Sequence, residues 1–192
     1  MSGRDRRVEI ALPAWLDDEP VVLGSRQDRM RHVVALARRN VREGTGGPFG
    51  AAVVRADSGE VLGVGVNLVV TARNSTAHAE MVALQIAERR VGRYDLGDVG
   101  PVQLVCSVEP CAMCLGAVVW SGVASLVCGA SDADARGIGF DEGPKPADWV
   151  AALSTRRIEV QRGLLREDAV AVLQEYAASG GVIYNAARRS AT

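Results

Sequence analysis

Two short stretches decide how this chain folds: Thr76-Ala77-His78-Ala79-Glu80 and, later, Glu109-Pro110-Cys111-Ala112-Met113-Cys114. They supply one imidazole and two thiols, and zinc prefers His nitrogen and Cys sulfur in a tetrahedral arrangement. Cys111 and Cys114 are three residues apart, so they share one face if this stretch is helical. Pro110 suits the first position of such a helix, where its missing N–H group costs nothing. Both thiols would then lie at the positive end of the helix dipole, which stabilises the thiolate form that binds zinc.

The first stretch adds a carboxylate that does not behave as a ligand. A helix is predicted over residues 78–90, with Ser75 or Thr76 as its N-cap. Glu80 lies two residues after His78, so it should not bind the same ion from that helix face. Three protein ligands leave the fourth zinc position for water, whose pKa falls to about 7 on the metal. We therefore expect Glu80 to accept a proton from that water, pass it to a ring nitrogen and then protonate a leaving amine.

A structural zinc site is the alternative interpretation, because a closed site needs a fourth protein ligand. The other Cys and His residues are Cys106, Cys128 and His32. Cys106 could complete a Cys3His set, but that interpretation leaves Glu80 without a role. Cys106 and Cys128 fall in apolar predicted strands, so we interpret them as small buried core residues.

The composition is that of an ordinary globular domain. The chain has 192 residues, of which 48% are hydrophobic and 23% charged, with a net charge of −1. That charge balance argues against a nucleic-acid partner, which usually requires a basic surface. No apolar run approaches transmembrane length, and the charged N-terminal stretch does not resemble a signal peptide. Cysteines used as metal ligands rather than disulfides favour a reducing cytoplasm.

Hydrophobic periodicity predicts an alternation of helices and strands. Helices are predicted over residues 25–43, 78–90, 111–120 and 167–178, and Ser25 with Asp28 is predicted to cap the first of them. Strands are predicted over residues 51–55, 61–66, 102–108, 124–130 and 158–161. Residues 132–146 are rich in Gly, Asp and Pro and are predicted to form a loop, as are residues 68–74 before the His78 helix. The alternation implies a mixed sheet with helices on both faces, with both zinc stretches following the carboxyl ends of strands.

The chain divides into three parts on the same pattern. Residues 1–24 lack periodicity and are interpreted as an N-terminal extension, with Trp15 and Leu16 packing on the body. Residues 25–178 form the domain that carries the zinc stretches. Residues 179–192 are a C-terminal tail.

These motifs resemble those of the cytidine deaminase-like superfamily, and within it the chain is most similar to bacterial guanine deaminases and other nucleobase deaminases. H-x-E followed by P-C-x-x-C is the signature of zinc-dependent base deaminases. The resemblance spans about residues 25–142, most of the chain. Outside the two zinc stretches it is carried by Gly47-Pro48-Phe49-Gly50-Ala51, Asn67, Leu115-Gly116-Ala117, Trp120 and Gly139-Phe140-Asp141.

The resemblance implies a three-layer α/β/α sandwich with a five-stranded mixed sheet, a homodimer, and one Zn²⁺ per subunit held by His78, Cys111 and Cys114. It implies that Glu80 is catalytic, and that Glu142 is a second catalytic carboxylate that reads the exocyclic amine or relays a proton. The C-terminal tail can close the site in this family, sometimes across a dimer; here Tyr184 either contacts substrate or anchors the tail. The residues expected to bind the base are Phe49, Asn67, Ala79, Trp120, Asp141 and Tyr184.

The favoured function is hydrolytic deamination of a small free base, with guanine preferred over cytosine or an s-triazine. A tRNA adenosine deaminase shares both zinc motifs, but it must hold a polyanion, which the net charge of −1 disfavours. An inactive module that keeps the zinc fold is disfavoured by the intact Glu80. The chain departs from the family at Asn74-Ser75, where Asp-Pro is frequent, and over residues 142–156. Both departures concern the identity of the substrate more than the chemistry.

Overall fold

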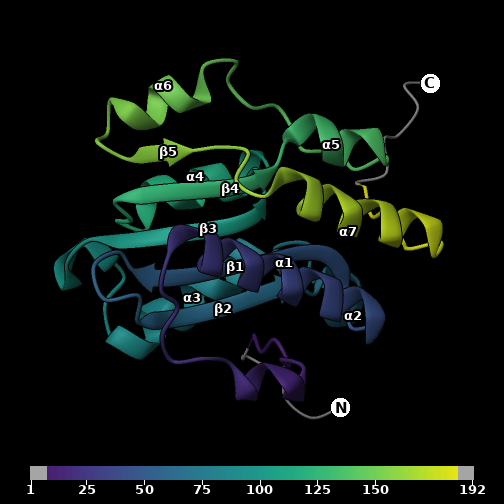
Figure 1. Ribbon diagram of the computed structural model, residues 1–192, viewed down its shortest axis with the longest axis horizontal. Helices are drawn as coiled ribbons and strands as arrows, with labels where there is room; N and C mark the ends of the chain where they lie inside the picture. Colours follow the sequence, from purple (N-terminus) through teal and green to yellow (C-terminus); the bar gives the residue numbers. More distant parts are fainter. Residues whose placement is uncertain (1–7, 186–192) are drawn as a thin grey trace, which may run out of the picture.

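The computed structural model of the chain describes residues 8–185, which form a five-stranded sheet between two layers of helices (Figure 1). The strands are β1 (Gly47–Arg55), β2 (Val61–Asn67), β3 (Val102–Val108), β4 (Ser125–Ala130) and β5 (Glu159–Gln161). They lie in the order β2-β1-β3-β4-β5. β1 is antiparallel to β2 and β3, whereas β3, β4 and β5 are mutually parallel. The predicted α/β/α sandwich with a mixed five-stranded sheet is therefore confirmed.

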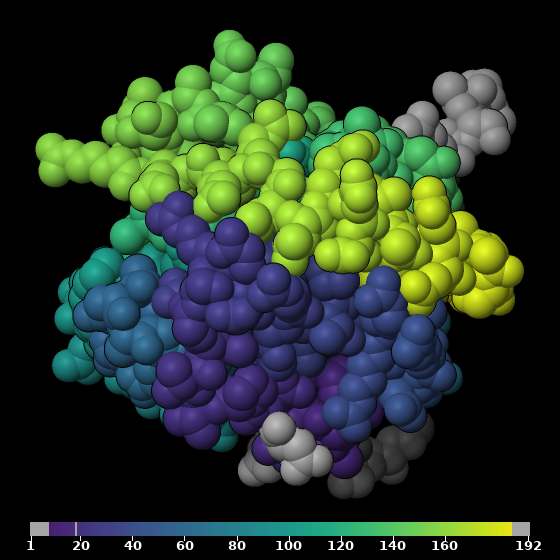
Figure 2. Space-filling model, viewed as in Figure 1, coloured from purple at the N-terminus to yellow at the C-terminus, as the bar shows by residue number. Residues whose placement is uncertain are grey.

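Helices cover both faces of this sheet. They are α1 (Arg26–Arg42), α2 (Val69–Ala72), α3 (Ala79–Val91), α4 (Ala112–Trp120), α5 (Asp132–Gly137), α6 (Trp149–Ser154) and α7 (Arg166–Ala178), with short 3-10 turns η1 (Ala14–Asp18) and η2 (Leu96–Val99). α1 and α7 pack on one face, and α3, α4 and α6 pack on the other. Figure 2 shows the first of these faces, with α1 in purple and blue beside the yellow-green α7.

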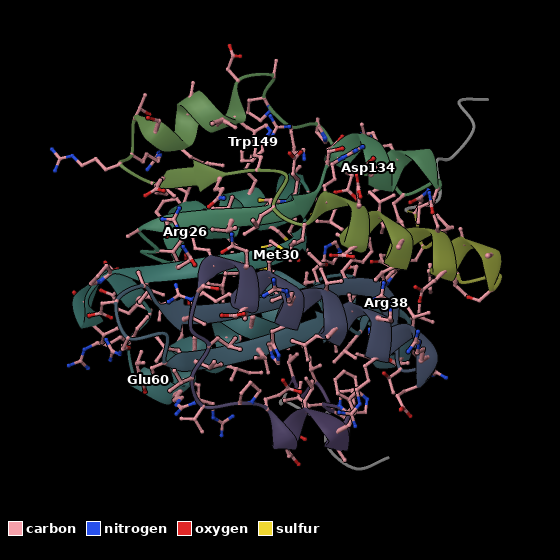
Figure 3. The ribbon with its side chains drawn as sticks, viewed as in Figure 1. Arg26, Met30, Arg38, Glu60, Asp134 and Trp149 are labelled. Carbon is pink, nitrogen blue, oxygen red and sulfur yellow. The ribbon has the colours of Figure 1, made fainter. Side chains whose placement is uncertain are left out.

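The alternation of side chains along the central strands produces two apolar cores. Ala52 and Val54 of β1 face the core under α1, whereas Ala51 and Val53 face the core under α3. A strand covered on both sides is apolar at every position, which is why β1 lacks the polar alternation of an exposed strand. On α1, Met30 is fully buried and contributes roughly 1.5–3 kcal/mol through burial (Figure 3).

Local sequence also fixes where α1 begins and how closely α3 approaches the sheet. Ser25 accepts a hydrogen bond from the backbone of Asp28, whose side chain binds the Ser25 backbone in return, forming the predicted capping box. A Cβ atom at Gly65 of β2 would lie 2.2 Å from the carbonyl oxygen of Ala79. Only glycine allows this approach, which seats the start of α3 directly on β2 and positions His78.

The segment after β4 differs from the prediction. Residues 132–146 were predicted to be a loop, but α5 occupies Asp132–Gly137, and α6 follows at Trp149. The reason is a second capping box, in which Ser131 and Asp134 exchange hydrogen bonds and start a short helix. Residues 68–74 were also predicted to be a loop and contain the short helix α2.

The N-terminal segment packs on the body of the domain. Leu16 on η1 is buried in the core under α1, and Trp15 packs against the same core. Residues 1–7 of the predicted extension and residues 186–192 of the predicted tail lie outside the described part of the chain. Across residues 8–185, no helix combines the length and the apolar character needed to cross a membrane.

Candidate zinc centre and active site

The two zinc stretches meet at one edge of the sheet. β2 and β3 both run antiparallel to β1, so their carboxyl ends lie at the same edge. His78 is the N-cap of α3, which follows β2, and Cys111 is the N-cap of α4, which follows β3. The predicted position of both stretches after strand ends is confirmed. Pro110, however, precedes the N-cap of α4 and is not the first helical residue, contrary to the prediction.

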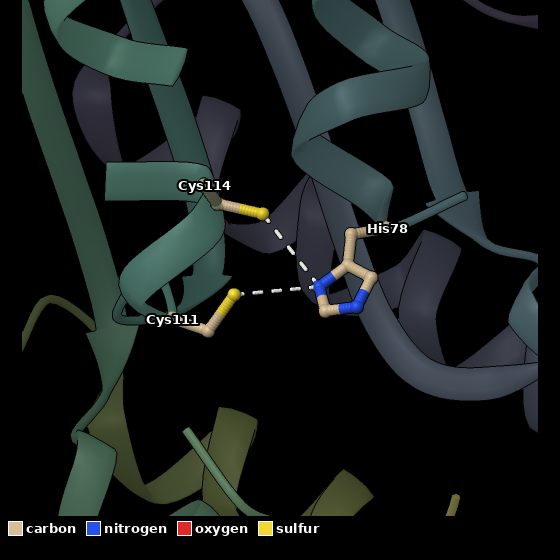
Figure 4. A group of neighbouring side chains, drawn as sticks. All are labelled: His78, Cys111 and Cys114. Carbon is tan, nitrogen blue, oxygen red and sulfur yellow. Dashed lines mark hydrogen bonds between the residues drawn. The ribbon is translucent and has the colours of Figure 1, made fainter. Parts of the chain in front are cut away.

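Three side chains converge between the starts of α3 and α4 (Figure 4). The Sγ atoms of Cys111 and Cys114 lie 3.5 and 3.6 Å from Nδ1 of His78. All three ligand atoms lie within 4.8 Å of one another. Sulfur and nitrogen atoms bound to one tetrahedral zinc are about 3.5 Å apart, given Zn–S and Zn–N bonds of about 2.3 and 2.0 Å. The donors and their spacing therefore fit zinc, and His78, Cys111 and Cys114 form a zinc site.

The ligands share negative charge in a way that suits a cation. A hydrogen bond from the Cys114 thiol outweighs burial and lowers the pKa of Cys111 to about 4. The same contact, together with burial, raises the pKa of Cys114. Burial opposes protonation of His78, but its contact with Cys111 and the charge of Glu80 raise the pKa of its imidazole. The charge of a bound zinc ion would let both thiols ionise together.

The N-cap predicted for α3 was wrong. Neither Ser75 nor Thr76 caps the helix, because the side chain of Asn74 captures this segment in a turn of its own. Oδ1 of Asn74 accepts hydrogen bonds from N and Oγ1 of Thr76, at 3.0 and 2.8 Å. The chain therefore turns before the helix, and His78 takes the N-cap position with its ring free to face the two thiols.

The closed Cys3His alternative finds no support in the structure. Cys106 lies in β3 directly opposite Cys128 in β4, and both side chains are buried in the apolar core under α3 and α4. Within residues 8–185, the one group of Cys, His, Asp and Glu side chains close enough to share an ion consists of His78, Cys111 and Cys114. The interpretation of Cys106 and Cys128 as core residues is confirmed.

Two buried carboxylates, Glu80 and Glu142, line the same cavity as His78 and Cys111. Glu80 is the second residue of α3 and lies outside the ligand group. Burial, together with the charge of Cys111, raises the pKa of Glu80. Burial and the charges of Cys111 and Glu80 raise the pKa of Glu142 to about 8, although the charge of Lys145 opposes this. Carboxyl groups with raised pKa values beside a metal are suited to carrying protons near neutral pH.

The cavity over the ligands has a volume of about 240 Å³ and aromatic walls. The rings of Phe49 and Phe140 meet edge-on at 5.0 Å, and the Tyr184 ring lies 5.2 Å from that of Phe140. Cavities for drug-sized ligands are larger, about 300–1,000 Å³, so this one suits a single small heterocycle. The lining residues are Phe49, Ser75, His78, Glu80, Glu109, Cys111, Phe140, Asp141, Glu142, Gly143, Tyr184 and Asn185.

The described part of the tail closes one side of this cavity. Nδ2 of Asn67 donates a hydrogen bond to the Tyr184 hydroxyl at 2.5 Å. The backbone N–H of Asp141 donates to Oδ1 of Asn185, whose Nδ2 donates to the carbonyl oxygen of Gly139, both at 2.9 Å. Burial raises the pKa of Tyr184, so its hydroxyl stays protonated. The tail thus contacts two of the residues predicted to bind the base.

Several predicted base-binding residues take different places. Phe49, Asp141 and Tyr184 lie in the cavity wall, whereas Asn67 is buried behind Tyr184. Ala79 has its side chain in the core under α3 and does not line the cavity. Trp120 departs most from the prediction. It is the last residue of α4, its side chain is 83% exposed, and it lies beside Tyr94 on an outer surface.

Five residues of the cavity wall were not among the predicted site residues: Ser75, Glu109, Phe140, Gly143 and Asn185. Glu109 had a signal in the sequence, because it is an acidic residue between an apolar strand and the zinc-binding turn. Acidic residues are seldom buried as Glu109 is. Its carboxylate accepts hydrogen bonds from the Arg162 guanidinium and, at 3.0 Å, from the backbone N–H of Asp132. Asn185 had no signal, since its position depends on a contact between segments more than forty residues apart.

Zinc held by one histidine and two cysteines, next to a carboxylate that is not a ligand, is the arrangement of zinc-dependent base deaminases. The fold and the site therefore define a zinc-dependent hydrolase of this class. A family model described as the cytidine and deoxycytidylate deaminase zinc-binding region matches residues 24–130. The chain belongs to this family and is a zinc-dependent nucleobase deaminase.

The similar proteins include guanine deaminases and tRNA-specific adenosine deaminases. A structure of the guanine deaminase from Nitrosomonas europaea matches with a TM-score of 0.87 at 46% identity, covering 92% of this chain and 100% of that chain. A structure of NE0047 in complex with 2,6-diaminopurine matches with a TM-score of 0.89 at 48% identity, covering 95% and 98%. The guanine deaminase of Bacillus subtilis (strain 168) is 40% identical over 113 residues, 59% of this chain and 69% of that protein. tRNA-specific adenosine deaminases also match, that of Buchnera aphidicola at 30% identity.

Proposed function

We propose that the chain is a guanine deaminase, which replaces the exocyclic amino group of the base with a carbonyl oxygen and releases ammonia. The observation that carries this proposal is the small aromatic cavity that holds Glu80 and Glu142 beside the zinc ligands His78 and Cys111. The guanine deaminase relatives support guanine as the substrate, since they match at higher identity than the tRNA-specific enzymes.

Glu80 is the proton carrier of the reaction. When bound, zinc lowers the pKa of a coordinated water to about 7 and so makes the oxygen nucleophilic at neutral pH. The Glu80 carboxylate accepts the proton that this water loses and transfers it to a ring nitrogen of the base. As the water oxygen bonds to the ring carbon, its second proton passes through the Glu80 carboxylate to the amino group, so that the C–N bond breaks, the carbonyl forms and ammonia leaves. Its buried position and raised pKa suit this alternation between two protonation states.

Glu142 recognises the substrate from the other carboxylate position in the cavity. A carboxylate accepts hydrogen bonds from an amino group and a ring N–H, which guanine presents side by side. Its raised pKa also allows it to exchange a proton with the bound base near neutral pH. Phe49 and Phe140 contact the faces and edges of the ring.

Asn67 and Tyr184 close the site over the base. In the structure their side chains bind each other, so an incoming base exchanges this contact for contacts of its own. Asp141 supports the same wall through the hydrogen bond of its N–H group to Asn185. We infer that the tail acts as a cover of the active site through its described residues, 179–185.

A homodimer explains the outer surface of α3 and α4. Trp120 and Tyr94 are 83% and 87% exposed and share a surface hollow with Met81 and Leu84. Apolar aromatic groups of this size are typical of protein interfaces. We expect light scattering to give twice the chain mass, and Trp120→Ser to shift the protein toward the monomer.

The free thiols of the zinc ligands suit a reducing compartment such as the cytoplasm.

The test is ammonia release from a panel of guanine, adenine, cytosine, isocytosine and s-triazines, with Glu80→Gln as the control. We expect guanine to give the highest kcat/KM, and the variant to retain zinc while its kcat falls by about 10²–10⁴-fold. A higher kcat/KM for another base would contradict guanine as the substrate. Wild-type turnover by Glu80→Gln would contradict the role of Glu80 as proton carrier. Release from adenosine in tRNA, weakened by salt, would instead favour the tRNA-specific reaction.

A further inference from the structure

Glu142 reaches the cavity from residues 138–148, the segment that joins α5 to α6, and one buried ammonium group ties this segment to the zinc-binding turn. Lys145 follows Glu142 by three residues, and its side chain is 8% exposed. Its Nζ donates a hydrogen bond to the carbonyl oxygen of Pro110 at 3.0 Å. Pro110 directly precedes the ligand Cys111. Lys145 therefore links the segment that carries Glu142 to the residue directly before the zinc ligand Cys111.

The same ammonium group is paired with α5. Nζ of Lys145 lies 2.6 Å from Oδ1 of Asp132, and Oδ2 of Asp132 accepts a hydrogen bond from Arg136 at 2.6 Å. Arg136 in turn donates to the carbonyl oxygen of Gly143 at 2.9 Å. Of the two cations bound to Asp132, Arg136 binds the backbone of Gly143, directly after Glu142. Lys145 binds the backbone of Pro110, directly before Cys111.

A buried lysine needs a reason, because burying an ammonium group is costly unless it is paired and hydrogen-bonded. Lys145 meets that condition with Asp132 and Pro110, and its Nζ also lies 5.7 Å from the centre of the Trp149 ring. It lines a polar hollow beside the active-site cavity and is not among the residues of the cavity wall. Figure 3 shows Trp149 on α6 and Asp134 on α5, on either side of the connecting segment.

We propose that Lys145 is a positioning residue that sets the place of the Glu142 carboxylate over the zinc centre. This inference rests on the proposed function, in which Glu142 acts on the base. The backbone of Glu142 already accepts a hydrogen bond from the N–H of Ala112 at 2.9 Å, which fixes its main chain on one side. Lys145 supplies a second fixed point three residues later, and together the two contacts hold the segment from which the Glu142 side chain enters the cavity.

The test is a double-mutant cycle of Lys145→Met and Glu142→Gln, assayed with guanine. Methionine has a side chain of similar length and removes the charge. We expect Lys145→Met to lower kcat by about 10-fold or more with KM changed less than about 3-fold, since a small misplacement of a catalytic group is enough for this loss. Zinc content should stay at one per chain. In the Glu142→Gln background, Lys145→Met should lower kcat by less than about 2-fold.

Arg166→Met is the matched control, because Arg166 also pairs with a carboxylate of α5, that of Asp134, and is not among the residues of the cavity wall. Its kcat should equal that of the wild type. Lys145→Gln keeps a donor for Pro110 and should give an intermediate kcat. Equal losses from Lys145→Met in both backgrounds, or loss of zinc, would overturn the role of Lys145. Wild-type kcat in Glu142→Gln alone would instead contradict the proposed function.

Discussion

The floor and the roof of the active site are built in different ways. The floor consists of His78, Cys111 and Cys114, which sit at the starts of two helices packed on the sheet. The roof consists of the Glu142 segment and residues 180–185, which are held by side-chain hydrogen bonds between segments distant in sequence. Because the floor rests on the sheet and the roof depends on side-chain contacts, we expect substitutions in the floor to affect metal binding and substitutions in the roof to affect turnover or substrate binding without loss of zinc.

The largest expected effect is on the floor. Cys111→Ser replaces a thiolate ligand with a hydroxyl group that binds zinc poorly, so we expect loss of zinc and a fall in kcat on the order of 10³-fold or more. Metal analysis of the purified variant and an ammonia-release assay measure both. Cys106→Ala is the matched control from the neighbouring strand and should keep its zinc. Full zinc content in Cys111→Ser would mean that Cys111 is not required to bind zinc, and the description of the floor as the metal-binding part of the site would be wrong.

The next effect concerns the Glu142 segment of the roof. Glu142→Gln keeps the size of the side chain but cannot accept or hold a proton, so we expect kcat for guanine to fall about 10²-fold with zinc retained. Steady-state kinetics and metal analysis on one preparation separate the two quantities. If zinc were lost as well, floor and roof would not be independent.

A smaller effect is expected from the tail. Tyr184→Phe removes the hydroxyl that accepts the hydrogen bond from Asn67, so we expect KM to rise about 3- to 10-fold with kcat changed less than about 2-fold. Tyr94→Phe, at an exposed outer position, is the control and should behave as the wild type. A fall in kcat as large as that of Glu142→Gln would place Tyr184 in the chemistry rather than the cover.

The smallest effect is on stability, in the α5 support of the roof. Burial alone would raise the pKa of Asp134, but hydrogen bonds from Ser131 and Arg166 outweigh burial and lower it. A folded-state pKa below the unfolded value gives stability that is present above about pH 4 and is lost as pH falls through the folded pKa. Asp134→Asn should therefore lower the free energy of unfolding by about 1 kcal/mol at pH 7, as measured by urea denaturation. The difference should vanish in acid, and a difference that persists there would contradict this assignment.

Sequence reasoning predicted the floor better than the roof for a physical reason. His78, Cys111 and Cys114 follow from donor chemistry and short spacing, and the strands that precede them are continuous apolar runs. Local rules also found the capping box at Ser25. They failed at α5, because residues 132–146 were predicted to be a loop although Ser131 and Asp134 form an equivalent capping box.

The remaining errors concern contacts between distant segments. Trp120 was placed in the base pocket by family resemblance, yet α4 directs its last residue to the outer surface. Asn185 was missed because its partners, Gly139 and Asp141, are brought to it only by the packing of α7 and the tail. Lysine is a residue type that usually lies on the surface, so the burial of Lys145 could not be predicted from the sequence and follows only from the fold.

The most direct test of the floor is X-ray absorption at the zinc edge of the purified enzyme. Two sulfur atoms at about 2.3 Å, one imidazole nitrogen and one further light atom at about 2.0 Å are expected, as for a catalytic site with one open position. Three sulfur neighbours, or two imidazoles, would mean that the fourth position belongs to the protein, and the account of the active site would be wrong.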